Sequence, residues 1–297
     1  MTDYDTPTCY ATLSAQLATQ LQTCRFKTIS HLQKTVFLPG NLAKEWDSQG
    51  SDFFSHWLDP SLSFYCGEFH PNNPDNLFLA QKNNHRNILK TFSCFHVSHI
   101  LQVDCQWGGF MTDCMCYGFD ITAQTHSHDH ATFCHNQVRS HKPKVNFLIT
   151  QDTVASISGT FDALVDLENL NRIPIRRWSS TLNAYSKKLK KGGLLFLQVL
   201  VSSQPQSYLD IPKKNQAPLS WIQQWAKNTN HTILHTRNLT PHYQSICTHW
   251  IHNLESERKA LLLQTPHVTQ WGTFLAFLQA ELATNQTQLV QLLIQKS

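Results

Sequence analysis

The 297-residue chain is poor in charged residues and has no long apolar run. Only 15% of its residues are charged, whereas 41% are hydrophobic, and the formal net charge is +4. A positive charge this small and scattered does not suit a nucleic-acid-binding protein. No stretch approaches the roughly 20 apolar residues that a membrane span needs. We therefore expect a polar rather than ionic surface, no transmembrane segment and no nucleic-acid partner.

The sequence also begins without the features of a secretory signal. Residues 1–5 carry neither a basic region nor an apolar one. The nine cysteines are an odd number, which argues against a complete set of disulfides. Cys105, Cys114 and Cys116 lie in or near apolar stretches, where we expect them to behave as small buried side chains. These features favour a reducing, cytoplasmic location, with peripheral membrane contact left open.

The order of the apolar runs predicts an α/β fold. Residues 10–38 have helical spacing and end before Pro39 and Gly40, which predicts a helical lead-in. From Ile100 onward, short apolar runs alternate with helix-length polar segments, a pattern typical of βαβ units and a mainly parallel sheet. The predicted strands are Ile100–Val103, Met115–Ile121, Val145–Ile149, Ala163–Leu167 and Leu194–Val201, and a helix at Leu219–Asn228 precedes a last strand pair at His231–Leu239 and Gln288–Gln295. We expect an N-terminal helical extension (1–42) and one main domain (43–297).

Residues 101–109 look like a nucleotide-cofactor loop that has lost glycines. An apolar lead-in runs into a turn, as when a buried strand feeds a helix whose N-terminus faces a ligand. Glycine suits such a turn because it adopts positive φ and lets a ligand approach the backbone closely. Here Asp104, Cys105 and Gln106 come before the glycines Gly108 and Gly109. This loop therefore leaves open whether the chain binds a cofactor.

Motifs along most of the chain, from about residue 43, resemble those of cyclopropane-fatty-acid synthases and mycolic-acid cyclopropane synthases. The loop at 101–109 is similar to their VLDIGCGWGG motif. No single match is specific, but their order and spacing together are. The matching segments are Asp52–Phe54, Trp57–Pro60, Phe64–Phe69, Asp75–Gln81, Gly118–Thr122, Gln151–Asp152, Phe161–Val165, Leu189–Gly193, Tyr243 with Trp250, and Gln288–Leu292.

The resemblance implies a class I S-adenosylmethionine methyltransferase fold. Such a fold has a seven-stranded, mostly parallel sheet with helices on both faces. The family's enzymes deliver a methyl group to the cis double bond of a lipid acyl chain and pass through a carbocation. They close a ring after a proton is lost, and bicarbonate is the base in the best-known members. A lipid acyl chain is thus one expected ligand.

The resemblance also assigns a cofactor loop, and this chain departs from the family pattern there. Gln102 replaces the acidic residue before the glycines. Asp104 and Gln106 replace the two glycines that let the methionine moiety lie against the backbone. Their side chains would project toward the cofactor or force different φ and ψ angles. The alternative is a loop that still binds the cofactor through Trp107–Gly109.

Other cofactor positions are partly kept. The tyrosine and serine of the family's YSC motif correspond to Phe64 and Tyr65, so one hydroxyl is lost and another sits on a longer side chain. Asp120, in the segment that includes Thr122, is expected to bind a ribose from the end of the second strand, and Asp152 to bind the adenine amine. The alternative role for both aspartates is helix capping. We expect S-adenosylmethionine binding to be weak or absent.

The base site departs from the family as well. Family members hold bicarbonate with a cysteine, a glutamate, a histidine, a tyrosine and a backbone group. Cys66 and Tyr243 stand at two of these positions, whereas Asn171 replaces the glutamate and Gln198 the histidine. Amides can donate hydrogen bonds to an anion, but they supply neither a carboxylate nor a titrating imidazole. The inherited arrangement cannot work unchanged.

A histidine-rich segment follows the second predicted strand. His126 and His130 form an i, i+4 pair that could bind zinc together with Cys134 or Asp129. The helix that matches this segment in the family is solvent-facing and holds no metal. We therefore expect no metal site here.

Two functions from different classes remain open. The first is a pseudo-methyltransferase that keeps the fold and serves as a binding or partner subunit, for example in a heteromer with an active family member. Replacements at four features of one site favour it. The second is an active but divergent enzyme that methylates a lipid or another nucleophile from a site rebuilt around Cys66, Asp120, Asp152 and Tyr243.

Overall fold

The computed structural model describes residues 9–22, 49–141, 143–203, 216–264 and 268–297. The strands are β1 (His99–Val103), β2 (Asp120–Gln124), β3 (Phe147–Thr150), β4 (Phe161–Leu167), β5 (Leu189–Ser202), β6 (Thr232–Asn238) and β7 (Thr287–Gln295). The helices are α1 (Tyr10–Gln22), α4 (Ser51–Ser55), α5 (Leu77–Cys94), α6 (Gly109–Cys116), α7 (His128–His141), α8 (Trp178–Lys188), α9 (Leu219–Asn228), α10 (Thr240–Ser256), α11 (Arg258–Gln264) and α12 (Val268–Ala283), with two short 3-10 turns at Asn169–Arg172 and Ile175–Arg177.

The strands form one seven-stranded sheet in the order β3-β2-β1-β4-β5-β7-β6. All pairings among β1 to β5 are parallel, and only β7 runs antiparallel to its neighbours β5 and β6. The predicted seven-stranded, mostly parallel sheet is therefore confirmed. Because parallel strands end at the same edge, the loops after β1 to β5 gather along one edge of the sheet.

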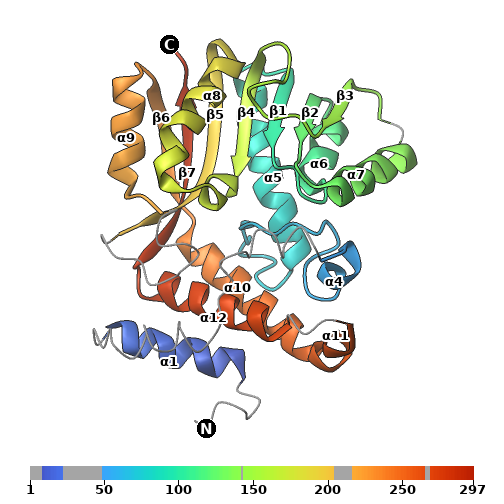
Figure 1. Cartoon of the computed structure of the whole chain (residues 1–297), viewed down its shortest axis with the longest axis vertical. Helices are drawn as coiled ribbons and strands as arrows, with labels where there is room; N and C mark the ends of the chain where they lie inside the picture. The colour runs from blue at the N-terminus through green and yellow to red at the C-terminus, as the bar shows by residue number, and fades with distance from the viewer. Residues whose placement is uncertain (1–8, 23–48, 142, 204–215, 265–267) are drawn as a thin grey trace.

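Helices cover both faces of the sheet, as predicted (Figure 1). Successive strand residues point to opposite faces. Ile100 accordingly packs into the core beneath α5, α6 and α7, whereas Leu101 packs into the core beneath α8 and α9. Apolar strand residues thus line a buried core on each face of the sheet, which is typical of a parallel sheet.

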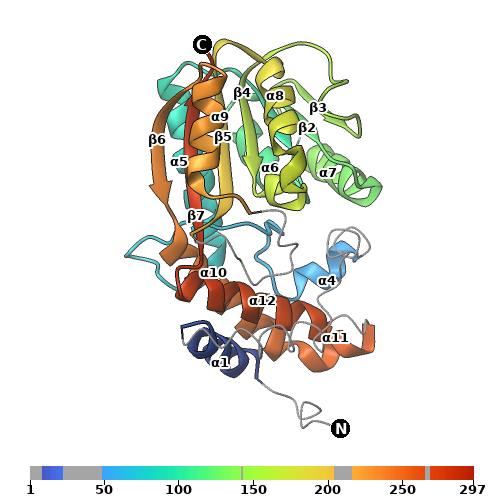
Figure 2. The same cartoon turned by 60° about the vertical axis from the view of Figure 1, so that its left-hand side comes forward.

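A third layer lies across the carboxyl ends of the parallel strands. It comprises α4, α10, α11 and α12, and α1 packs against α12 on the far side of this layer from the sheet (Figure 2). Its core is strongly aromatic: Phe53, Phe54, Trp57, Trp250 and Trp271 are all less than 5% exposed. We call this layer the cap. Any site at the carboxyl edge of the sheet lies between the sheet and the cap.

Three local predictions were wrong. The run 115–121 is not one strand, because α6 continues to Cys116 and β2 begins only at Asp120. Gly118, with a φ of 85°, makes the turn between them. Cys116 is exposed, whereas Cys105 and Cys114 are buried as expected. The third strand begins at Phe147 rather than Val145. The lead-in helix is present over α1, and its predicted continuation to residue 38, like the expected domain boundary near 42, lies outside the described residues.

Candidate functional site

The loop after β1 keeps a left-handed backbone without its glycines. Asp104 and Gln106 adopt φ angles of 48° and 50°, and Gly108, which precedes α6, has a φ of 83°. Residues with a Cβ atom rarely adopt such angles, because Cβ clashes with the backbone. The loop thus has the shape that glycines would give it, and the two side chains project from it.

The side chain of Gln106 lies against Phe64, which follows Ser63 in the segment between α4 and α5. Its Oε1 atom accepts a hydrogen bond from the backbone N–H of Phe64 at 3.1 Å, and Gln106 is only 2% exposed. Asp104 points elsewhere: its Oδ2 atom is 3.1 Å from the guanidinium of Arg172, which follows β4. The loop is therefore tied to Phe64 on one side and to Arg172 on the other.

The retained residues of the loop are held by packing. A Cβ atom at Gly109 would lie 2.6 Å from Oγ of Ser63, and one at Gly108 would lie 2.9 Å from Sγ of Cys134. Trp107 is buried against the rings of His130 and Phe133, at centroid distances of 4.3 and 5.2 Å. Close packing thus accounts for Trp107 and Gly109, and close packing together with a left-handed backbone accounts for Gly108.

The methionine half of the predicted cofactor site presents side chains in place of a bare glycine backbone. A buried amide side chain lies where the bare backbone of a glycine loop would receive the methionine moiety, and it is bonded to the neighbouring segment. Gln102, at the position of the family's acidic residue, makes no side-chain hydrogen bond within the described residues. It is fully buried within β1.

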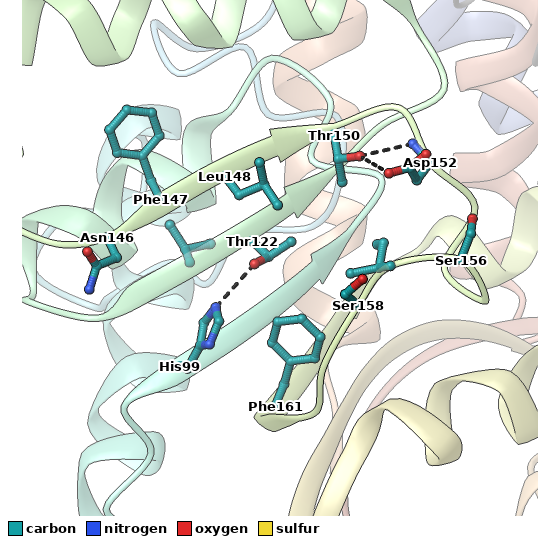
Figure 3. A pocket seen from close by; sticks show the side chains of 12 residues that line it. His99, Thr122, Asn146, Phe147, Leu148, Thr150, Asp152, Ser156, Ser158 and Phe161 are labelled. Atoms are coloured by element: carbon teal, nitrogen blue, oxygen red, sulfur yellow. Dashed lines mark hydrogen bonds between the residues drawn. The ribbon is translucent and has the colours of Figure 1, made fainter.

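Thr122 and Asp152, predicted for the nucleoside half, line a cavity of about 350 Å³ over one face of β1 to β3 (Figure 3). The hydroxyl of Thr122 is 3.1 Å from Nε2 of His99, and Asp152 exchanges hydrogen bonds with the Thr150 hydroxyl. This face is open because residues 151–160, all described, form turns and no helix. Leu148 is 53% exposed beside it.

Asp120 does not occupy the position predicted for it. It begins β2 instead of ending it, and its carboxylate accepts two hydrogen bonds from Asn146. The strand's carboxyl end is Gln124, about 13 Å away at 3.3 Å per residue. The prediction placed Asp120 at the end of the second strand, where it would bind a ribose, and this placement was wrong. Gln124 is the β2 residue that contacts the loop after β1, because its Oε1 atom accepts a hydrogen bond from the backbone N–H of Asp104 at 3.1 Å.

The hydroxyl of Tyr65 belongs to a buried chain of hydrogen bonds beside α5. It accepts from the Ser63 hydroxyl at 3.1 Å and lies 2.9 Å from Nε2 of His85. The other ring nitrogen of His85 is 2.6 Å from the carboxylate of Asp113. His85 thus links the Tyr65 hydroxyl to the Asp113 carboxylate. The Tyr65 hydroxyl is therefore hydrogen-bonded to other side chains of the protein.

Three of the four predicted catalytic residues meet at one carboxylate that the sequence reasoning missed. The carboxylate is that of Glu168, directly after β4. Its Oε1 atom accepts from the backbone N–H of Cys66 and from Nε2 of Gln198, both at 2.8 Å. Its Oε2 atom accepts from the hydroxyl of Tyr243 at 2.6 Å. An acidic residue directly after a buried parallel strand is the signal that could have found it, because ligands bind at that edge.

Asn171, the fourth predicted residue, does not join this group. Its side-chain amide donates to the backbone carbonyl of Leu200 and accepts from the N–H of the same residue, both at 2.8 Å. It therefore fastens the turn after β4 to strand β5. The carboxylate that meets the predicted catalytic residues thus comes from Glu168, three residues before Asn171.

The group continues into a buried amide network. Oε1 of Gln198 accepts from Nδ2 of Asn84 at 3.1 Å and from Nε2 of Gln291 at 2.8 Å, and Asn84 also donates to the carbonyl of Cys66. We call the six residues Cys66, Asn84, Glu168, Gln198, Tyr243 and Gln291 the carboxylate cluster. All are less than 10% exposed.

Burial governs the protonation states in the cluster. It raises the pKa of the Glu168 carboxyl, an effect opposed by the hydrogen bonds from Cys66, Tyr243 and Gln198 and by the charge of Arg172. Burial, followed by the Glu168 charge, raises the pKa of the Cys66 thiol well above its ordinary value. Cys66 is therefore a protonated thiol that donates to the carbonyl of Gly67, and it is unsuited to act as a nucleophile.

The histidine-rich segment does not assemble a metal site. Among the described residues, no three His, Cys, Asp or Glu side chains gather closely enough to hold an ion. His130 instead packs on Trp107, and burial lowers its pKa to about 4. Cys134 lies beside Cys105, with the sulfur atoms 3.9 Å apart.

The strand order and the loop at the carboxyl edge of β1 define a class I S-adenosylmethionine methyltransferase fold. A family model described as mycolic acid cyclopropane synthetase matches residues 39–292, so the chain belongs to this family. The family's enzymes use S-adenosylmethionine. Across the described residues, no helix is both long and apolar enough to cross a membrane.

Two curated relatives come from Mycobacterium tuberculosis. A probable fatty acid methyltransferase is 22% identical over 258 residues, which cover 83% of this chain and 60% of the relative. A tuberculostearic acid methyltransferase is 20% identical, over 81% of this chain and 61% of the relative. The chain thus spans about three fifths of these relatives. The solved structure of the mycolic acid cyclopropane synthase CmaA1, complexed with SAH and CTAB, is 18% identical and superposes with a TM-score of 0.72, over 83% of this chain and 94% of that one.

Proposed function

We propose that this protein is a pseudo-methyltransferase: a member of the family that binds a partner or a lipid acyl chain and does not transfer methyl groups. The observation that carries the proposal is the buried Gln106 side chain in the cofactor loop. The cofactor could enter only if this amide left its site and the Phe64 N–H lost its acceptor. Leaving a buried donor without a partner costs about 1–3 kcal/mol, before any steric term.

The Asp104 side chain supports the same conclusion. It occupies a second former glycine position and is paired with Arg172 across the loop. S-adenosylmethionine carries its own positive sulfonium and ammonium groups, so a free carboxylate could in principle attract it. Here the carboxylate already has a cationic partner, and moving the side chain aside would break that pair. The proposal is therefore supported by two independent side chains of one loop.

The cap supports a binding role. Aromatic rings connect it to the carboxylate cluster: Trp250 of α10 stacks on Phe64, which follows α4, with centroids 4.7 Å apart, and lies 6.0 Å from Tyr243 of the cluster. Apolar linings tolerate substitution better than a polar constellation does, so an acyl-binding surface can outlast the chemistry. The solved relative complexed with CTAB is consistent with an apolar ligand in this fold.

A catalytically intact family member is the protein partner that we propose. Subunits that arise by duplication inherit a self-complementary interface, which can pair them as a heterodimer. Deleting this protein is then expected to lower the stability or activity of that partner. Cys66→Ala should have little effect on the same readout, because its thiol is protonated and bonded to a neighbouring carbonyl.

The decisive experiment is titration calorimetry of the purified protein with S-adenosylmethionine and with S-adenosylhomocysteine. We expect no measurable heat of binding up to about 1 mM ligand. Circular dichroism and a cooperative thermal melt establish that the sample is folded. A dissociation constant in the micromolar range or below would contradict the proposal. Native mass spectrometry of gently purified protein tests the binding role, with a bound lipid expected in part of the sample.

One observation favours the second candidate, an active divergent methyltransferase. Glu168 is a buried carboxylate with a raised pKa at the carboxyl edge of the sheet, properties that suit a general base. Incubation with labelled S-adenosylmethionine and unsaturated phospholipid tests this candidate. It requires label transfer by the wild type and its loss in Glu168→Gln.

A further inference from the structure

Three hydrogen-bond donors from separate parts of the chain converge on Glu168. The backbone N–H of Cys66 comes from the segment after α4, the amide of Gln198 from β5, and the hydroxyl of Tyr243 from α10. Each lies 2.6 to 2.8 Å from a carboxylate oxygen, and all three residues are buried. Donors to an ionised acceptor at these distances make strong hydrogen bonds.

The donors are fixed independently of Glu168. Oε1 of Gln198 accepts from both Asn84 and Gln291, so the NH₂ group of Gln198 has to face Glu168. The Cys66 N–H is held because the carbonyl of the same peptide group, that of Tyr65, accepts from Nε2 of Gln81 at 2.7 Å. Tyr243 is placed by the buried face of α10. The arrangement is therefore an anion-binding site built by the fold around a carboxylate.

Glu168 reaches this site from an unfavourable backbone conformation. Its φ and ψ angles are 68° and 6°, in the left-handed region, and its N–H is bonded to the carbonyl of Gln198 at 2.8 Å. A left-handed conformation costs a residue with a Cβ atom free energy that glycine would not lose. Such strain persists only where the surroundings impose it and is concentrated at functional sites.

We propose that Cys66, Gln198 and Tyr243 form a binding site for one planar oxyanion of the carboxylate or bicarbonate class, and that this chain fills the site with its own Glu168. The protein consequently needs no free anion, and the site is closed to one as long as Glu168 is in place. This inference does not depend on whether S-adenosylmethionine binds.

The test is to remove the tethered carboxylate and supply a free one. In Glu168→Gly the backbone can keep its left-handed angles without strain, and the side chain leaves a space of carboxylate size beside the three donors. The melting temperature is measured in 100 mM sodium formate, acetate or bicarbonate, against 100 mM sodium chloride. We expect formate to raise the melting temperature of the variant saturably, by roughly 2–4 °C for a dissociation constant of about 1–10 mM. The wild type should not respond.

Matched variants separate binding at this site from general salt effects. Glu168→Gln fills the same space without a charge, so it should not respond to formate. Glu168→Gly combined with Tyr243→Phe lacks one of the donors, and its half-saturating formate concentration should rise at least fivefold. Titration of ¹³C-formate followed by NMR reports binding directly, and S-adenosylmethionine is omitted throughout so that its binding plays no part.

Each outcome decides the proposal. A formate response confined to Glu168→Gly supports it, and so does a variant that folds only when formate is present. Equal responses in the wild type and in both Glu168 variants would overturn it. So would a Glu168→Gly protein that is indifferent to every anion, or one that stays unfolded in all of them.

Discussion

Restoring the glycine loop is the sharpest test of the reasoning about the cofactor site. The double variant Asp104→Gly, Gln106→Gly removes both projecting side chains and suits the observed φ angles of 48° and 50°. Relief of left-handed strain should contribute about 1–2 kcal/mol at each position. Glycine's greater freedom in the unfolded chain should cost about 0.5–1 kcal/mol at each.

The lost contacts bring the balance close to zero. The Gln106 to Phe64 hydrogen bond contributes about 1 kcal/mol. The ion pair of Asp104 with the quarter-exposed Arg172 contributes at most about 1 kcal/mol, because solvent screens it. We therefore expect the double variant to melt within a few degrees of the wild type, and to remain a valid subject for binding measurements.

Calorimetry with S-adenosylmethionine should then detect binding in the double variant and none in the wild type. Displacing the Gln106 amide and opening the Asp104 pair accounts for roughly 2 kcal/mol, which corresponds to a gain in affinity of about thirtyfold. The control is Asp104→Ala, Gln106→Ala, which removes the same side-chain groups but keeps a Cβ atom at both strained positions, so it should be less stable and bind more weakly. A folded glycine variant with no detectable binding at 1 mM would refute the idea that these two side chains close the site.

The remaining predictions concern stability. Burial raises the pKa of the Asp166 carboxyl to about 7. The folded state therefore keeps a proton that the unfolded state releases above about pH 4. Because of this group, the free energy of unfolding falls as the pH rises from 4 to 7. In chemical unfolding, Asp166→Asn should gain on the wild type across that interval by up to about 1.4 kcal/mol per pH unit, and a difference independent of pH would contradict this. Burial of His130, whose pKa is lowered to about 4, has the opposite effect on the pH dependence of stability. The stability that neutral His130 contributes is present above about pH 6.5 and is lost as the pH falls toward 4. The unfolding free energy of the wild type minus that of His130→Phe should therefore decrease over that range. Asn171→Ala should lower stability by about 2–3 kcal/mol, because two buried backbone groups of Leu200 lose their partner, whereas Asn169→Ala, which loses one bond to Tyr185, should cost about 1 kcal/mol or less in the same thermal melts.

The sheet and its helices were largely predictable from the sequence, because their signals are local. Leu219–Asn228 was placed at its observed bounds, and the strands at Ala163–Leu167 and Leu194–Val201 were right within a few residues. The run 115–121 was not, since the end of a buried helix and the start of the next strand are both apolar. That shift moved Asp120 from the end of a strand to its beginning.

The candidate site was less predictable because it depends on backbone conformation. Matching the sequence to family motifs places Asn171 at the glutamate position and counts the carboxylate as lost. The structure brings a different carboxylate, that of Glu168 three residues earlier, to Cys66 and Tyr243 through a left-handed backbone. Nor does the sequence say that Gln106 bonds to Phe64, 42 residues away. Which residue types are present was known; where their polar atoms meet was not.

The packing of α1 against α12 bears on how the chain folds. Tyr10 and Leu17 of α1 are buried in the cap, and a Cβ atom at Gly272 would come within 2.2 Å of the Tyr10 ring. About 245 residues separate the two helices, and closing a loop of that length costs roughly 5 kcal/mol of chain entropy. During synthesis α1 emerges long before α12 does, so the α1 face that packs on Gly272 stays uncovered until that helix has been made. A single missing side chain at position 272 thus allows the first and last described helices to meet, which makes their contact a late step in folding.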